Sequence, residues 1–249
     1  MEKRFGGASR GTRRSPASLL YISKNIPDLS GAGESVSGPL LELDELSWDQ
    51  DGCPRTLKPR HLLVEAGTKA VVLAKDAADA DAFGDVLIGQ DWPTRGRIRI
   101  SNDDVTRLAS RERGIALVPA GGGLLPHLSI EQNIGFGIPS RHPEDSWKKR
   151  VKYTAGQLNL HGFLDCRPHD LSPDERLRVA LARAMCRWPT AKIVVVEDRT
   201  GHPPCHAAVS ESLKAYPDLP VLVVTDDRHR VETLHTSATA WEIVDADES

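Results

Sequence analysis

The side chains best suited to metal chemistry lie in the run His-Pro-Pro-Cys-His, which places His202, Cys205 and His206 close together. Imidazole and thiolate ligands suit zinc. Zinc sites of this kind take further ligands from a second Cys or His pair, and the sequence has no such pair at the usual spacing. We therefore predict a surface turn here and no metal site, with zinc binding as the alternative.

The composition is that of a globular protein. The 249 residues are 39% hydrophobic and 27% charged, which is enough chain for a large core. A formal net charge of -3 argues against broad binding to nucleic acid, which needs a basic excess. The four cysteines form no C-x-x-C pair, and no apolar run approaches the roughly 20 residues of a spanning helix. We expect a chain of the reducing cytoplasm.

Residues 1–38 differ from the rest of the chain. They are rich in Gly, Ser and Pro and carry six basic residues against three acidic ones. This composition predicts a flexible basic tail. The tail is either a solvated arm or a contact to a membrane surface or a permease.

The remaining chain alternates between strand and helix patterns. Residues 40–46 alternate as a strand does, residues 57–64 form a second extended stretch, and Ala70–Leu73 is a short apolar run typical of a buried strand. A helix is predicted from about Asp81, stopping at Gly89.

The second half of the chain also contains helix and strand patterns. Residues 129–188 are mostly helical in spacing, and two Val-rich runs, 192–196 and 221–225, predict buried strands with helical residues 207–216 between them. The result is an α/β core interrupted by a helical subdomain.

One segment carries a family resemblance. Residues 171–185 read LSPDERLRVALARAM and precede an apolar strand that ends in Glu197 and Asp198. This resembles the signature helix and Walker B strand of ABC transporter ATPases. The run PHLSIEQNI at 126–134 is similar to the stretch after the Q-loop in importer-type members.

The resemblance covers about residues 40–244 and implies an α/β fold. We expect an ABC ATPase-like domain at 39–249, with a P-loop NTPase core (39–120 and 189–249). An inserted α-helical subdomain (about 121–188) and an antiparallel β subdomain complete it.

The resemblance places the phosphate loop G-x-x-x-x-G-K-[ST] at residues 74–81, where its chemistry is missing. Ala74 and Asp79 replace the two glycines, Ala80 replaces the lysine and Asp81 replaces the magnesium-binding hydroxyl; Asp76 adds another carboxylate. These carboxylates would repel a triphosphate, so we expect no ATP on this loop. They would instead cap the helix that begins near Asp81. The alternative is a modified site that takes nucleotide in another pose.

Other catalytic positions of the family are altered as well. Ala120 stands at the Q-loop glutamine, and Asp226 stands at the switch histidine. Glu197 and Asp198 keep two carboxylates in reversed order, and Arg199, where the family has proline, is placed to pair with them. We expect no catalytic residue among these degenerate positions.

The signature motif is changed where the family's motif contacts ATP held by the opposite subunit. It consists of Leu171, Ser172, Pro173, Asp174 and Glu175. Pro173 has no N–H, and Asp174 places a charge where a glycine N–H would approach the γ-phosphate. A partner's ATP would therefore be poorly bound here.

The resemblance also implies a groove that receives a short helix of a membrane permease. The residues matching its lining are Leu124, Leu125, Pro126, His127 and Ile130. The alternative is that this run is plain core. The adjacent Gly121-Gly122-Gly123 makes the approach flexible or forms a turn.

The resemblance therefore implies a catalytically inactive subunit, the structural or regulatory half of a transporter, on the cytoplasmic face of the membrane. It would pair with an active ABC ATPase, which would hold ATP and Mg, and dock on a permease; a substrate-binding protein would join through the complex. Two alternatives remain: a degenerate ATPase that still binds or slowly hydrolyses ATP, and a soluble regulator with the same fold.

Overall fold

A computed structural model describes residues 40–138, 144–187, 190–234 and 240–246. The chain divides into two units, Met1–Gly33 and Glu34–Ser249, and the second is described here. The predicted tail, residues 1–38, lies outside the described residues. No described helix has both the length and the apolar character needed to cross a bilayer.

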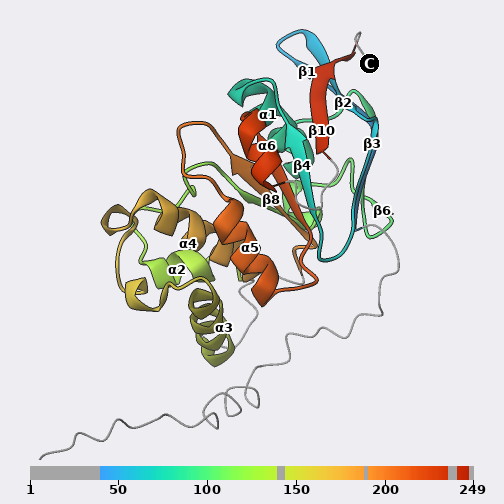
Figure 1. Cartoon of the computed structure of the whole chain (residues 1–249). Coiled ribbons are helices and arrows are strands. Elements are labelled where there is room, and N and C mark those ends of the chain that lie inside the picture. Colours follow the sequence, from blue (N-terminus) through green and yellow to red (C-terminus); the bar gives the residue numbers. More distant parts are fainter. Residues whose placement is uncertain (1–39, 139–143, 188–189, 235–239, 247–249) are drawn as a thin grey trace, which may run out of the picture. The chain divides into compact units, whose positions relative to one another are not determined.

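The described part of the second unit contains both strands and helices (Figure 1). The strands are β1 (Leu41–Gln50), β2 (Cys53–Lys58), β3 (His61–Val64), β4 (Lys69–Leu73), β5 (Arg95–Ile100), β6 (Asp103–Asp104), β7 (Ile115–Val118), β8 (Ile193–Asp198), β9 (Val221–Thr225) and β10 (Ala240–Asp245). The helices are α1 (Ala77–Ile88), α2 (Ile130–Gly135), α3 (Glu144–Gln157), α4 (Pro173–Met185), α5 (His206–Ala215) and α6 (Arg228–Leu234).

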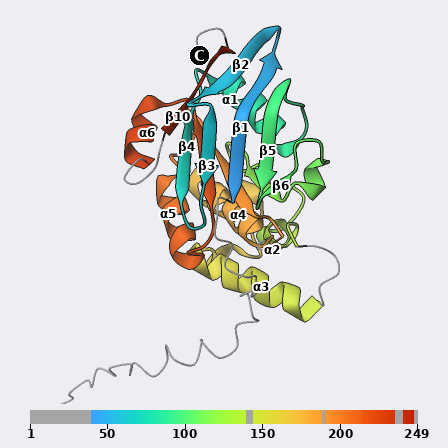
Figure 2. The ribbon, with the colours of Figure 1, turned by 90° about the vertical axis from the view of Figure 1, so that its right-hand side faces the viewer.

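The described strands form one mixed sheet in the order β6-β5-β1-β2-β10-β4-β9-β8-β7, with β3 paired to β1. Strands β10, β4, β9, β8 and β7 run parallel, whereas β1, β2, β3, β5 and β6 pair antiparallel (Figure 2). The predicted α/β fold with an antiparallel β part is confirmed. In a parallel sheet the carboxyl ends of the strands meet at one edge, which is where ligands bind in such folds.

The two faces of the parallel strands pack into two different cores. Val72 and Val224 join Phe83 of α1 and the inner side chains of β1 in one cluster. Val71 and Val223 join the buried faces of α4 and α5 in the other. Alternate residues of each strand point to opposite faces, so a nearly continuous apolar run serves both cores.

The helical subdomain is built from α2, α3 and α4, which contact one another. Ser129 caps α2 and forms a capping box with Gln132. The indole N–H of Trp147 in α3 donates to the carbonyl of Gly135 at 3.2 Å, and a β-carbon on Gly135 would collide with that ring. These helices fall within the range predicted for the inserted subdomain.

Two predicted elements differ from the structure. The stretch 57–64 forms the separate strands β2 and β3. The helix predicted from about Asp81 begins at Ala77, because the Asp76 carboxylate accepts the Asp79 N–H at 2.9 Å and caps it one turn earlier. The predicted stop is confirmed: Gly89 ends α1 with a φ of 76°.

Arg113 holds the C-terminal end of α1. Its side chain is fully buried, and its guanidinium group donates to the carbonyls of Val86, Leu87, Thr106 and Leu108 at 2.7 to 2.9 Å. The last turn of α1 contains no basic residue of its own, so Arg113 supplies the positive charge that this end of the helix favours.

We expect Arg113→Met to lower the free energy of unfolding by about 3 kcal/mol or more, because four carbonyls lose their donor, three of them in buried hydrogen bonds. Chemical denaturation measures this. Arg111→Met is the matched control: the Arg111 side chain is 83% exposed and pairs with neighbouring Glu112, so the expected change is within about 0.5 kcal/mol. Equal stabilities of the two variants would contradict the role given to Arg113.

Candidate functional site

The segment between β4 and α1 does not form the loop that the phosphate template requires. Residues 77–80, which the template assigns to the phosphate cradle, are the first turn of α1. Their backbone N–H groups belong to a helix that Asp76 already caps. Only Ala74, Lys75 and Asp76 remain as a connection, so a cradle cannot form in this conformation.

Asp79 is held inside the domain rather than at the helix end. Its side chain is 1% exposed, and its carboxylate accepts Nε of Arg55 in β2 at 2.8 Å. Arg55 also contacts Asp245 of β10. The interpretation that Asp79 and Asp81 cap the helix is therefore wrong. Asp76 is the cap, because the carboxylates of Asp79 and Asp81 form ion pairs with arginines.

Asp81 and Glu197 share a buried guanidinium group. Arg199 Nη2 lies 2.6 Å from Asp81 Oδ1 and 3.5 Å from Glu197 Oε1, and the Arg199 side chain is 6% exposed. The other oxygen of Glu197 accepts the backbone N–H of Ala120 at 3.1 Å. The predicted pairing of Arg199 is thus confirmed for Glu197, and Asp81 is an additional partner.

The longer side chain of Glu197 fits because α1 passes it with a glycine. A β-carbon on Gly84 would lie 3.1 Å from Glu197 Oε1. Burial raises the pKa of Glu197, and the Ala120 N–H and Arg199 lower it in part. The carboxylate at the end of β8 is therefore held by donors instead of standing free for a metal or a water molecule.

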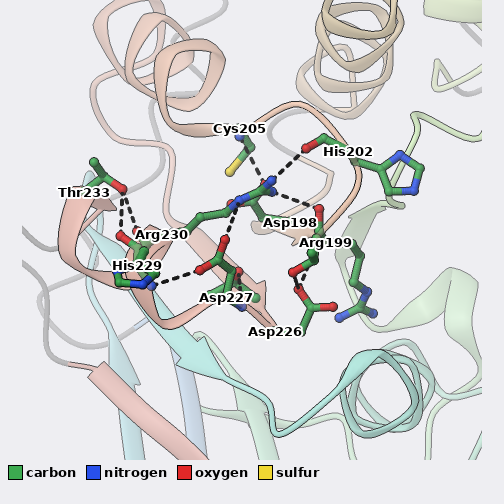
Figure 3. A network of polar contacts seen from close by, with 11 residues as sticks. Asp198, Arg199, His202, Cys205, Asp226, Asp227, His229, Arg230 and Thr233 are labelled. Atoms are coloured by element: carbon green, nitrogen blue, oxygen red, sulfur yellow. Dashed lines mark hydrogen bonds and ion pairs between the residues drawn. The ribbon is translucent and has the colours of Figure 1, made fainter.

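A second arginine holds the carboxylate of Asp198. Arg230 Nη1 donates to Asp198 Oδ1 at 2.7 Å and to the carbonyl of Arg199 at 2.9 Å, while Nη2 donates to the carbonyl of His202 at 2.7 Å. Figure 3 shows Arg230 at the centre of this network, with Asp227 as a further partner. Burial raises the pKa of Asp198, and Arg230 opposes that shift.

Asp226, at the position of the switch histidine, lies near the start of the loop that follows β8 (Figure 3). Its Oδ1 accepts both the backbone N–H of Thr200, at 2.7 Å, and the Thr200 hydroxyl, at 2.9 Å. The structure thus brings Asp81, Ala120 and Glu197 together around Arg199, and Asp198 and Asp226 lie beside them as partners of the loop after β8. The arrangement consists of ion pairs and hydrogen bonds that hold these side chains in place.

The signature-like motif caps its own helix. Ser172 is the N-cap of α4, and Glu175 Oε2 lies 2.7 Å from both its backbone nitrogen and its hydroxyl. Asp174 accepts Arg178 Nε at 2.7 Å, and Arg178 also contacts Glu211 of α5. Leu171 is buried and Pro173 opens the helix. The helix end that would face an anion therefore carries carboxylates.

A groove of about 610 Å³ lies between β7, α2 and the C-terminal part of α4. Of the predicted docking residues, Leu125 lines it. Leu124 packs against the helical core, whereas Pro126 and His127 are exposed. The assignment of Ile130 to a docking surface is wrong, because its side chain is fully buried in that core.

Three residues that line this groove, Phe136, Arg183 and Arg187, were not predicted from the sequence. Phe136, 67% exposed, is the most exposed large hydrophobic side chain reported for the described residues. Arg183 and Arg187 line the groove with it, and burial lowers the pKa of each. Arg183 lies in α4 and Arg187 follows four residues later, just past the end of that helix, and this spacing is the signal that could have found them.

The glycine run is a fixed turn. Gly121, Gly122 and Gly123 all have positive φ angles, of 73°, 89° and 51°. Arg183 donates to the carbonyls of Gly122 and Gly123 at 3.0 and 2.9 Å. This pairing ties the turn after β7 to the helical subdomain.

The possible zinc ligands do not converge. Cys205 is buried at the start of α5, where burial raises the pKa of its thiol, whereas His202 and His206 are exposed. Among the described residues no group of three or more His, Cys, Asp or Glu side chains is placed to hold a metal ion.

Comparison with known proteins gives a consistent result. The ABC transporter family model matches residues 83–194. The chain is 34% identical over 155 residues to the sn-glycerol-3-phosphate import ATP-binding protein UgpC of Escherichia coli strain K12. These aligned residues make up 62% of this chain and 43% of the relative. The protein of that name from Shigella boydii gives the same values. The chain thus spans less than half the length of these curated relatives.

Solved structures share the fold. CbiO1 from Clostridium perfringens, part of the ABC transporter complex cbiONQ, matches with a TM-score of 0.65 at 19% identity over 84% of this chain and 88% of that one. MJ0796, a bacterial ABC transporter cassette, matches with a TM-score of 0.62 at 17% identity over 82% and 98%. The solved structures thus show that the domain has the α/β fold of ABC cassettes, and part of its sequence is similar to ABC transporter ATP-binding proteins.

Proposed function

We propose that this chain is a catalytically inactive ABC-type subunit that serves as the structural half of an importer. The observation that carries the proposal is the first turn of α1. Residues 77–80 are helical and capped by Asp76, where a nucleotide-binding member needs an open loop of backbone N–H groups. An ATP triphosphate would have to displace this turn and face Asp76 and Asp81.

The family match supports the same conclusion. It spans residues 83–194, so it includes neither the phosphate-loop positions 74–81 nor Glu197 and Asp198. The positions that would hold the phosphates and the metal thus lie outside the matched range, whereas Ala120 and the signature-like positions 171–175 lie inside it.

The proposed partners follow from the groove and from the relatives. An amphipathic helix of a permease would place its apolar side chains against Leu125 and Phe136. The relatives named as import ATP-binding proteins favour an importer. An active ABC ATPase would hold ATP and Mg at its own loop, and a substrate-binding protein would join through the complex. Docking on a permease would keep this chain at the cytoplasmic face of the membrane.

A second candidate function is residual nucleotide binding. A cavity of about 410 Å³ lies at the carboxyl ends of β4 and β10, and it is lined by Ala74, Lys75 and Arg228, among others. Lys75 would be the cation for a bound phosphate. The acidic lining residues Asp79, Asp226, Glu242 and Asp245 oppose such binding.

We expect the purified chain to show no binding of ATP by titration calorimetry at millimolar nucleotide, with or without Mg²⁺, because its phosphate positions are helical and acidic. Micromolar, Mg²⁺-dependent binding would contradict the proposed inactivity. If that binding were lost in Lys75→Ala, the cavity beside Lys75 would be the site and the second candidate would be favoured.

We expect Phe136→Asp to reduce recovery of a permease with the chain from detergent-solubilised native membranes by about tenfold or more, because a buried aromatic contact of 1.5 to 3 kcal/mol is lost. Quantitative mass spectrometry measures the recovery. The matched control is Leu63→Asp: Leu63 is 49% exposed on β3, in the antiparallel part of the sheet, and should leave recovery unchanged. Unchanged recovery with Phe136→Asp would rule out docking at this groove.

A further inference from the structure

Arg199 joins three segments that are far apart in the sequence. Its guanidinium group contacts Asp81 in α1 at 2.6 Å and Glu197 at the end of β8 at 3.5 Å. Glu197 in turn accepts the N–H of Ala120, in the connection after β7. The family resemblance assigns the metal-binding hydroxyl, the Walker B carboxylate and the Q-loop glutamine to these three positions.

The residues present do not fit a divalent cation. Mg²⁺ needs oxygen ligands at about 2.0 to 2.1 Å in octahedral geometry. Here the nearest oxygens are already engaged by a guanidinium group, Ala120 has no side-chain ligand, and no metal-ligating group of three occurs among the described residues. A second cation in contact with this guanidinium group would be repelled.

We infer that the guanidinium group of Arg199 takes the place of the divalent cation as a positive charge that is part of the chain. This inference rests on the proposed function and deepens it. The carboxylates at this site are neutralised permanently and do not depend on a nucleotide to bring a metal. The contacts among α1, β8 and the connection after β7 therefore have the same charge balance whether or not ATP is present.

The burial of Arg199 supports this role. The side chain is 6% exposed, and its Nη1 atom is buried without a hydrogen-bond partner. An arginine that served only as a surface ion pair would turn this group toward water. The Glu197 side chain is 11% exposed, and Asp81 and Asp85 act on it as like charges. Without Arg199 these carboxylates would repel one another as like charges, which favours capture of a divalent ion.

The test is a Mn²⁺ titration of the full chain and of Arg199→Met, followed by electron paramagnetic resonance. We expect no bound Mn²⁺ at this site in the unsubstituted chain and one in Arg199→Met, together with a rise of its thermal midpoint on adding Mn²⁺. Arg199→Met/Glu197→Gln should lose both effects. Arg230→Met, which removes the neighbouring guanidinium group from Asp198 instead, should not gain the Glu197-dependent Mn²⁺ site.

A folded Arg199→Met, checked by far-UV circular dichroism, that binds no Mn²⁺ overturns the inference. So does an unsubstituted chain that binds Mn²⁺ and loses it in Asp81→Asn, a substitution at an exposed side chain; this second measurement applies even if Arg199→Met does not fold. Neither readout involves ATP or a partner. Metal-independent ATP binding would therefore contradict the proposed inactivity without contradicting this inference.

Discussion

The buried carboxylates at the end of β8 set the main constraint on this domain. Glu197 and Asp198 are 11% and 1% exposed, and each must meet a positive charge or hydrogen-bond donors to remain there. Arg199 and Arg230 supply those charges. The positions of α1, of the loop after β8 and of α6 follow from these pairings, because each arginine reaches its carboxylate only if the element next to it is in place.

The fold and the order of its elements could be predicted from the sequence because they depend on apolar periodicity and on one long motif. The runs at β4, β8 and β9 and the helix α4 have patterns that are hard to reconcile with another fold. The start of α1 could not be predicted. It depends on one side chain, Asp76, which accepts an N–H and moves the boundary by four residues. A template that assigns a loop to this position gives no indication that a helix can form there instead.

The site shows the same division. The residue types at positions 74–81 are enough to expect that phosphate chemistry is lost. Their partners lie far away in the chain: Arg55 is in β2, and Arg199 follows β8. Spacing along the sequence carries no information about such pairs, which is why Asp79 and Asp81 were expected at a helix cap. The burial of Ile130 and the exposure of Phe136 could not be predicted for a similar reason. Both lie in apolar runs, and tertiary packing decides which of their side chains point into the core.

The first turn of α1 also limits how the sequence can change. A lysine at position 80 would replace a fully buried alanine, and a glycine at position 79 would leave Arg55 without that carboxylate. Either change costs folding stability before it contributes anything to nucleotide chemistry. On the proposed function, lost catalysis is therefore difficult to regain in evolution, because single substitutions toward the template residues give a less stable protein and not an active enzyme.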